Sequence, residues 1–183
     1  MLVLLIGSKA CGKSTVGPIF ARKLKLPFED ADEVLESIYA ERFGKRLGFR
    51  EIFRREGPEP FALLEAEAVQ KCLRAGDRVV ALGGGAPARL ELKGEFAVDV
   101  LVVYLEVPED VLWKRMLRDE LPVYLDSEKP REDFQRILNE RVPIYERLAD
   151  LRIGANRDPN KVAEEVLVKV NELIQGERKH TTS

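Results

Sequence analysis

The segment from Gly7 to Ser14 (GSKACGKS) constrains the fold of this chain more than any other stretch. It matches the phosphate-binding pattern G-x-x-x-x-G-K-[ST] at every fixed position. An apolar run at residues 2–6 precedes it, and residues 15–24 follow with apolar side chains at helical spacing. A strand, a glycine-bearing loop and a helix in this order form the context in which the pattern binds polyphosphate, so we expect a nucleotide site here.

The residue types of this loop explain how it would bind a polyphosphate. Glycine permits backbone angles closed to other residues, so successive N–H groups can turn toward an anion, and the following helix adds its positive N-terminal end. We expect Lys13 to reach the β- and γ-phosphates of ATP and Ser14 to bind Mg²⁺ through its hydroxyl. The loop residues that we assign to the nucleotide are Gly7, Ala10, Cys11, Gly12, Lys13, Ser14 and Thr15.

Composition narrows the functions open to this chain. Its 183 residues suit one domain, and 30 Lys and Arg against 32 Asp and Glu give a net charge of −2. That balance lacks the basic field typical of proteins that bind nucleic acid or anionic membranes. No apolar run approaches the roughly 18 residues of a membrane span, and no secretory leader is recognisable. We therefore expect a cytoplasmic monomer with a small-molecule substrate and no nucleic-acid or membrane partner.

Cysteine and histidine are scarce. Cys11 and Cys72 are too few for a disulfide scaffold, and the single histidine, His180, lies near the end of the chain, so we expect no zinc site. Cys11 stands beside Lys13 at an expected helix N-terminus, where thiols can become reactive. We favour the simpler interpretation, a small residue accommodated in the loop, and expect metal to enter only with the nucleotide.

Apolar runs alternate with helical patterns along the chain. We expect strands at residues 2–6, 26–30, 78–82, 100–105 and 151–153. Helical patterns follow the phosphate loop and resume near residues 31, 58, 109, 133 and 162. This alternation predicts an α/β fold in which helices cover both faces of a parallel sheet. We assign residues 1–175 to one domain and residues 176–183 to a polar tail.

Three features should meet at the carboxyl ends of these strands, where such sheets bind ligands. The phosphate loop follows the first expected strand, Asp30 and Asp32 follow the second, and residues 83–85 (GGG) follow the third. The aspartates either cap a helix or act on the ligand, one holding hydrated Mg²⁺ and the other accepting a proton or hydrogen bond from a hydroxyl. Three glycines favour close backbone approach to a ligand over an ordinary turn.

Arg141 lies on the apolar side of the helix expected at residues 133–148. An inward guanidinium needs an anion. We favour a bound substrate or phosphate, with an internal carboxylate such as Glu140 or Glu65 as the alternative. Before this helix, the charged stretch 118–131 is interrupted by two prolines and is long enough for a mobile lid.

Five segments taken together resemble the shikimate kinases. They are residues 7–14, 30–32 (DAD), 57–65, 82–85 (LGGG) and 141–145 (RVPIY). The similarity spans residues 2 to about 175, and the triple glycine with the Arg-x-Pro-x-Tyr segment is more specific than the phosphate loop alone. The resemblance implies a three-layer P-loop kinase of the nucleoside-monophosphate-kinase type with a five-stranded parallel sheet in the order 2-3-1-4-5. It also implies ATP- and Mg²⁺-dependent conversion of shikimate to shikimate 3-phosphate in aromatic amino-acid biosynthesis.

The resemblance assigns roles to individual residues. Lys13 and Asp32 would be catalytic, with Asp32 holding and activating the acceptor hydroxyl, while Ser14 binds Mg²⁺ and Asp30 contacts it through water. A substrate-binding region would span residues 31–62 and a lid residues 118–131. The acceptor would contact Asp32, Gly83, Gly84, Gly85 and, through its carboxylate, Arg141. Arg115 and Arg157 would lie near the adenine.

Two arginines of the family pattern are missing. The family has Phe-Arg where this chain has Phe61 and Ala62, which removes a second contact to the acceptor carboxylate. The lid has Leu121 where the family has an arginine that covers the phosphates. Replacements from other positions are conceivable. For the carboxylate they are Arg54 or Arg55, and for the lid Arg118 or Arg131.

Three hypotheses follow from this pattern. The first is a shikimate kinase with unusual arginines. The second is a sibling kinase that phosphorylates another small polyol or hydroxy acid, because Ala62 enlarges and neutralises the acceptor pocket. The third is a nucleotide-binding module whose catalysis has decayed, which Leu121 favours and the intact Lys13, Ser14 and Asp32 oppose.

Overall fold

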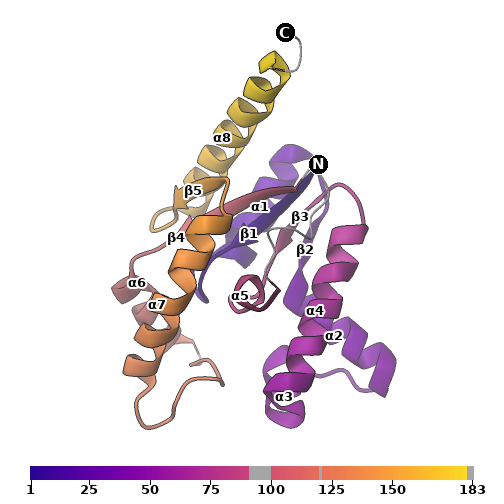
Figure 1. The fold of residues 1–183 in the computed structure, drawn as a ribbon, viewed down its shortest axis with the longest axis vertical. Coiled ribbons are helices and arrows are strands. Elements are labelled where there is room, and N and C mark those ends of the chain that lie inside the picture. The colour runs from indigo at the N-terminus through magenta and orange to yellow at the C-terminus, as the bar shows by residue number, and fades with distance from the viewer. Residues whose placement is uncertain (91–99, 120, 181–183) are drawn as a thin grey trace.

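A central parallel sheet organises the molecule. The computed structural model describes residues 1–90, 100–119 and 121–180. Its strands are β1 (Leu2–Ile6), β2 (Phe28–Asp30), β3 (Arg78–Ala81), β4 (Val100–Glu106) and β5 (Leu151–Gly154). All four strand pairs are parallel, and the order across the sheet is β2-β3-β1-β4-β5 (Figure 1). The α/β class and the strand order 2-3-1-4-5 are thereby confirmed.

Helices connect these strands. They are α1 (Lys13–Leu24), α2 (Ala31–Phe43), α3 (Phe49–Glu56), α4 (Pro58–Arg74), α5 (Ala86–Leu90), α6 (Glu109–Arg118), α7 (Pro130–Leu148) and α8 (Pro159–His180). The sequence pattern did not reveal α3 or α5, because each is short and each begins beside a glycine that suggested a loop. Helix α8 continues to His180, into the stretch that we described as a tail.

The apolar residues of the sheet divide between two cores because successive side chains of a strand point to opposite faces. Val3 and Leu5 belong to a core that contains side chains of α1 and α8, whereas Leu4 and Ile6 face a core shared with α4. Helix α7 contributes to both. Burial on both faces explains why β1 has no polar position.

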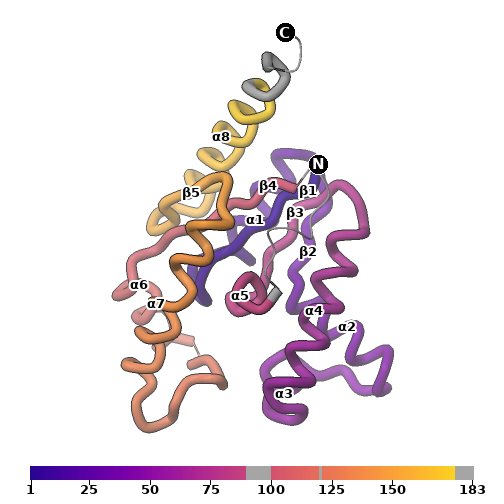
Figure 2. The backbone as a smooth tube through the Cα atoms, in the orientation of Figure 1, coloured from indigo at the N-terminus to yellow at the C-terminus, as the bar shows by residue number. Residues whose placement is uncertain are grey.

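A third, smaller core holds α2, α3 and α4 together. It includes Leu35, Tyr39, Ile52, Phe61 and Leu64, all nearly inaccessible to solvent. These three helices form one arm of the molecule, and α6 and α7 with the segment between them form the other (Figure 2). Both arms extend beyond the carboxyl ends of the strands, the edge at which sheets of this kind bind ligands.

The segment expected to form a lid connects α6 and α7. Between residues 121 and 129 it forms turns, and Asp126 Oδ1 accepts hydrogen bonds from the backbone N–H groups of Glu128 and Lys129. Leu121 and Leu125 pack against the first core. The mobility of this lid stays a prediction. In the described part of the chain, every helix is too short or too polar to cross a bilayer.

Candidate active site

A cavity of about 780 Å³ lies at the carboxyl ends of β1, β2 and β3. The phosphate loop, the Asp30–Asp32 junction and the glycine triplet all line it, together with residues of α3, α4, α6 and α7. Tertiary structure therefore brings the three expected features together. The cavity is continuous from Arg157 on the β5 side to Phe61 on α4, which gives room for a nucleotide and a second ligand side by side.

The backbone of the phosphate loop has the conformation that its glycines permit. Gly7 and Gly12 have φ angles of 140° and 104°, and Ala10 adopts φ 66°, a rare value for a residue with a side chain. At Gly7 a Cβ atom would lie 2.8 Å from the carbonyl oxygen of Leu105 on β4, so only glycine fits there. Cys11 is 1% exposed and belongs to the core, as expected for a small residue accommodated in the loop.

The ammonium group of Lys13 lies over its own loop. Its Nζ donates hydrogen bonds to the carbonyl oxygens of Gly7 at 2.8 Å and Ser8 at 3.1 Å. Both acceptors are neutral, so an anion in the loop would be a stronger partner for the same cation.

Ser14, in the phosphate loop, and Asp30, at the end of β2, contact each other in the cavity. The hydroxyl of Ser14 donates a 2.6 Å hydrogen bond to Asp30 Oδ2, while Asp30 Oδ1 accepts one from the backbone N–H of Asp32 at 3.1 Å. Asp30 thus caps α2 and also faces Ser14. The two alternatives that the sequence left open for Asp30 are compatible, because its two oxygens serve different partners.

Asp32 lies in an acidic, partly desolvated environment. Burial, followed by the neighbouring charges of Asp30 and Glu65, raises the pKa of its carboxyl to about 7. Lys13 and Lys9 oppose this shift. A carboxyl group that titrates near neutrality exchanges protons at physiological pH, which suits a group that accepts a proton from a hydroxyl.

Each member of the glycine triplet accommodates a different part of the protein. A Cβ atom at Gly83 would lie 2.9 Å from Asp32 Oδ1 and 3.0 Å from Glu65 Oε1. At Gly84 it would lie 3.3 Å from the backbone nitrogen of Lys9, in the phosphate loop. At Gly85 it would lie 2.8 Å from two nitrogens of the Arg89 guanidinium. The triplet is therefore needed for the close approach of three different groups at one strand end.

Helix α7 places Arg141 in the cavity. The fully buried Tyr145 donates a hydrogen bond from its hydroxyl to the carbonyl oxygen of Gly84, and Arg141 lies one turn earlier on the same face. The Arg141 guanidinium lies 5.4 Å from the ring centre of Tyr124, a lid residue. The two carboxylates considered as internal partners bind elsewhere, since Glu140 pairs with Arg136 and Glu65 with Arg89.

Arg115 and Arg157 approach the cavity from its other end. Arg115 donates hydrogen bonds to the carbonyl oxygen of Ala10 at 3.0 Å and to Asn156 Oδ1 at 3.3 Å. Arg157 binds the carbonyl oxygen of Gly154 and pairs with Glu165. Both arginines line the cavity beside the phosphate loop, and their contact with an adenine stays a prediction.

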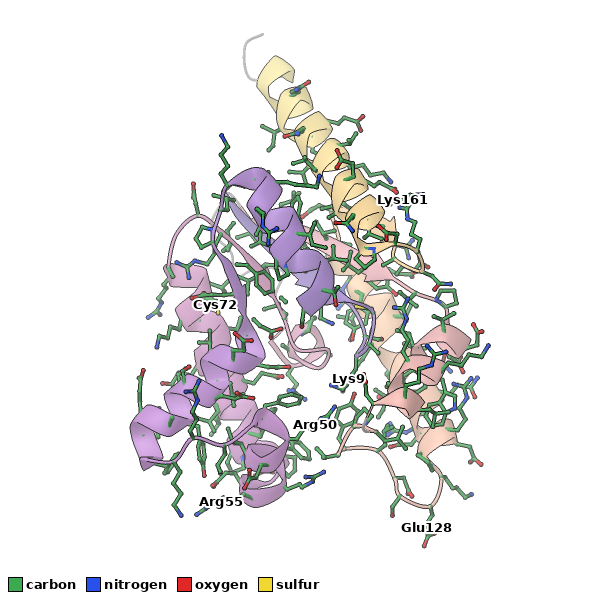
Figure 3. All side chains as sticks on the ribbon, turned by 180° about the vertical axis from the view of Figure 1, so that it is seen from behind. Lys9, Arg50, Arg55, Cys72, Glu128 and Lys161 are labelled. Carbon is green, nitrogen blue, oxygen red and sulfur yellow. The ribbon has the colours of Figure 1, made fainter. Side chains whose placement is uncertain are left out.

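Several cavity residues were not identified from the sequence. Arg89 is the most important of them, and Lys9 is another; Glu65 was named only as an alternative partner of Arg141. Lys9 extends toward α3, where it lies 5.2 Å from the ring centre of Phe49, and Figure 3 shows it close to Arg50. Burial, followed by the charge of Arg50, lowers the pKa of Lys9. Glu65 alone gave a sequence signal, because it occupies the apolar face of its helix and needs a partner there.

Of the four arginines suggested as replacements for those missing at positions 62 and 121, some line the cavity and others do not. Arg55 lies at the outer end of α3, where it pairs with Glu56, and neither it nor Arg54 lines the cavity (Figure 3). Arg131 pairs with Glu109 and lies over Trp113, whereas Arg118 does line the cavity.

Comparison with known proteins identifies the family. Residues 9–171 match the family described as Shikimate kinase. The chain belongs to the shikimate kinase family. A shikimate kinase of Rhizobium meliloti (strain 1021) is 34% identical over 170 residues, which cover 92% of this chain and 84% of that relative. Another shikimate kinase, of Rhizobium leguminosarum bv. trifolii, is 35% identical over 168 residues, which cover 90% of this chain and 81% of that relative.

Solved structures of the shikimate kinase family share this fold. The enzyme from Acinetobacter baumannii in complex with shikimate has a TM-score of 0.77 and 28% identity, covering 96% of this chain and 93% of that one. The Aquifex aeolicus shikimate kinase has a TM-score of 0.74 and 27% identity, with coverage of 96% and 99%. A gluconokinase from Sinorhizobium meliloti 1021, at 18% identity and TM-score 0.62, shares the fold alone. That Ala62 and Leu121 occupy positions of family arginines stays a prediction from the resemblance.

Proposed function

We propose that this protein transfers the γ-phosphate of ATP to a hydroxyl of shikimate and forms shikimate 3-phosphate, as a cytoplasmic monomer. One observation carries the proposal beyond family membership. Asp32, whose pKa is raised to about 7, lies in the same cavity as the phosphate loop. A proton acceptor beside a polyphosphate site is what phosphoryl transfer to an alcohol requires.

The donor half of the cavity would hold the nucleotide. In our proposal the β- and γ-phosphates replace the carbonyl oxygens of Gly7 and Ser8 as partners of the Lys13 ammonium. The backbone N–H groups of the loop and the N-terminus of α1 add further donors. Arg115 and Arg157 border the far end of this half, where the adenine would lie.

The residues between the two halves fit a hydrated Mg²⁺ ion. Magnesium prefers hard oxygen ligands, keeps several waters and needs only one or two groups from the protein. Ser14 Oγ and Asp30 Oδ2, 2.6 Å apart, are such oxygens, and no group of three or more potential ligands forms a closed cage within residues 1–90, 100–119 and 121–180. We propose that Ser14 binds the ion directly and Asp30 through water. When bound, Mg²⁺ would neutralise charge on the transferred phosphoryl group.

The acceptor half would hold shikimate against the glycine triplet. Asp32 would accept the proton of the attacking hydroxyl, whose oxygen forms a bond to the γ-phosphorus as the bond to the bridging oxygen of ADP breaks. Gly83, Gly84 and Gly85 would let the ring approach the backbone, and the Arg141 guanidinium would bind the carboxylate. We propose that Arg118, which lines the cavity at the start of the lid, covers the phosphates.

A coupled assay of ADP release tests the proposal. We expect turnover that requires ATP, Mg²⁺ and millimolar shikimate, and that Lys13→Ala abolishes. Turnover with another hydroxy acid or polyol but not with shikimate would favour a sibling kinase. Binding of ATP without turnover of any acceptor would indicate decayed catalysis. Sedimentation of the purified protein with and without ATP tests whether it is a monomer.

A further inference from the structure

Arg89 on α5 is attached to a buried carboxylate and reaches into the cavity. Its Nε donates a 2.8 Å hydrogen bond to Glu65 Oε2, and its Nη2 donates a second to the same oxygen. The side chain of Glu65 is 6% exposed, whereas that of Arg89 is 39% exposed. Arg89 is therefore anchored on its buried side and open on the other.

The guanidinium of Arg89 has donors to spare at this position. A guanidinium carries five N–H groups in a planar fork. Within residues 1–90, 100–119 and 121–180, Glu65 engages two of them, which leaves three for another acceptor. The group lies directly over Gly85, where a Cβ atom would be 2.8 Å from both Nη1 and Nη2. The buried ion pair and this glycine together define where the remaining N–H groups point, and Arg89 lines the cavity there.

A second guanidinium serves the same part of the cavity. Arg141, Arg89 and Asp32 line the same cavity as Tyr124, and the charges of all three act on the Tyr124 hydroxyl. Arg136 also lines the cavity, but its guanidinium already pairs with Asp133 and Glu140. Arg115 and Arg157 lie beside the phosphate loop, and Arg118, at the end of α6, is the arginine that we assign to the phosphates. Arg89 and Arg141 are thus the arginines best placed to bind one anion near Asp32.

We infer that Arg89 and Arg141 together bind the carboxylate of the acceptor, and that Arg89 takes over the function that an arginine at position 62 would have. This inference rests on the proposed function. Position 62 lies three residues before Glu65 on α4, so an arginine there would reach the same carboxylate along the helix. Ala62 has no charged group to do so, and Glu65 instead pairs with Arg89 of α5. One of the two arginines that recognise the acceptor is therefore supplied by the residues after the glycine triplet.

A comparison of shikimate with its methyl ester separates binding of the acceptor carboxylate by Arg89 from the structural role of its pair with Glu65. The ester has the same ring and hydroxyls but no negative charge. In Arg89→Met we expect KM for shikimate to rise roughly 10- to 100-fold, as for loss of a charge-assisted hydrogen bond, with kcat and KM for ATP changing less than about threefold. KM for the ester should change little, so the preference for shikimate over ester collapses.

Three further variants guard against a folding defect. Gly85→Ala displaces the guanidinium without removing its charge and should raise KM for shikimate more than KM for the ester. The double variant Ala62→Arg/Arg89→Met should recover most of the shikimate affinity, because the new arginine can pair with Glu65. Arg55→Met, on α3 outside the cavity, is the matched control and should behave as the wild type.

The outcomes separate the two proposals. If the wild type phosphorylates shikimate and Arg89→Met weakens shikimate and ester equally, Arg89 merely neutralises Glu65 and the inference is overturned. Wild-type-like KM for shikimate in Arg89→Met overturns it as well. If the wild type phosphorylates neither compound, the proposed function fails, and the role of Arg89 falls with it.

Discussion

The hydroxyl of Ser14, at the start of α1, donates a 2.6 Å hydrogen bond to Asp30 at the end of β2. Sixteen residues separate the two in sequence, yet they share one point in the site because β1 and β2 both end at the same edge of the sheet. A hydroxyl and a carboxylate held together in this way can share a hydrated cation without large rearrangement.

Ser14→Ala should therefore weaken the response to magnesium specifically. We expect the Mg²⁺ concentration for half-maximal activity to rise roughly 10- to 100-fold, with a smaller increase in Asp30→Asn, which acts through water. Magnesium titrations at saturating ATP and acceptor measure this. Ser37→Ala is the control, because its hydroxyl donates to the carbonyl oxygen of Glu33 in its own helix. Equal responses in Ser14→Ala and Ser37→Ala would argue against the assignment.

Asp32 should make the protein less stable as the pH rises. In the unfolded chain its carboxyl ionises near pH 3.8, and in the folded protein near pH 7. Between these values the unfolded state binds fewer protons, so the free energy of unfolding falls with increasing pH. Asp32→Asn cannot ionise, and its stability advantage should grow from near zero at pH 4 to roughly 1 to 3 kcal/mol at pH 8, while activity is lost.

Urea denaturation of both proteins across this pH range, without nucleotide or metal, measures the difference. Asp110→Asn on the exposed surface of α6 serves as the control. A stability difference between Asp32→Asn and wild type that does not vary with pH would contradict the raised pKa.

Alanine at two adjacent glycines should produce two different kinetic defects. In Gly83→Ala the new Cβ meets the carboxylates of Asp32 and Glu65, so we expect kcat to fall roughly 10- to 100-fold by misplacing the proton acceptor. In Gly84→Ala the Cβ presses on the backbone of Lys9, so KM for ATP should rise. Steady-state kinetics with both substrates varied would distinguish them. The same defect in both variants would mean that the glycines act only as a common turn.

Removing the hydroxyl of Tyr145 should loosen the connection between α7 and the glycine triplet. Tyr145→Phe leaves the carbonyl oxygen of Gly84 without this donor, and we expect a loss of roughly 1 to 2 kcal/mol in the free energy of unfolding. Because Arg141 lies one turn away, KM for the acceptor should also rise. Tyr39 belongs to the third core, and Tyr39→Phe loses the hydrogen bond from its hydroxyl to Glu56. In this variant we expect reduced stability but an unchanged KM for the acceptor. Calorimetry and kinetics of both variants test the contrast.

Local patterns in the sequence predicted most of the donor half. The phosphate loop, its strand and its helix are contiguous, and their conformation depends on backbone preferences of nearby residues. Apolar runs likewise predicted the parallel sheet, since strands buried on both faces leave a clear pattern. Helices α3 and α5 were missed because eight and five residues are too few to show a period beside glycines.

The acceptor half depended on tertiary structure. From the sequence alone, Glu65 was only an alternative partner for Arg141. Arg54 or Arg55 was the suggested second arginine for the acceptor carboxylate, and Arg89 was not identified. Packing decided the matter, because α4 and α5 meet at the end of β3 and bring together residues 24 positions apart. The sequence by itself thus determined that a polyphosphate is bound and where along the chain. Only the tertiary structure decided which arginine faces the acceptor, because an ion pair between two helices depends on their relative position and not on the residues adjacent to either partner.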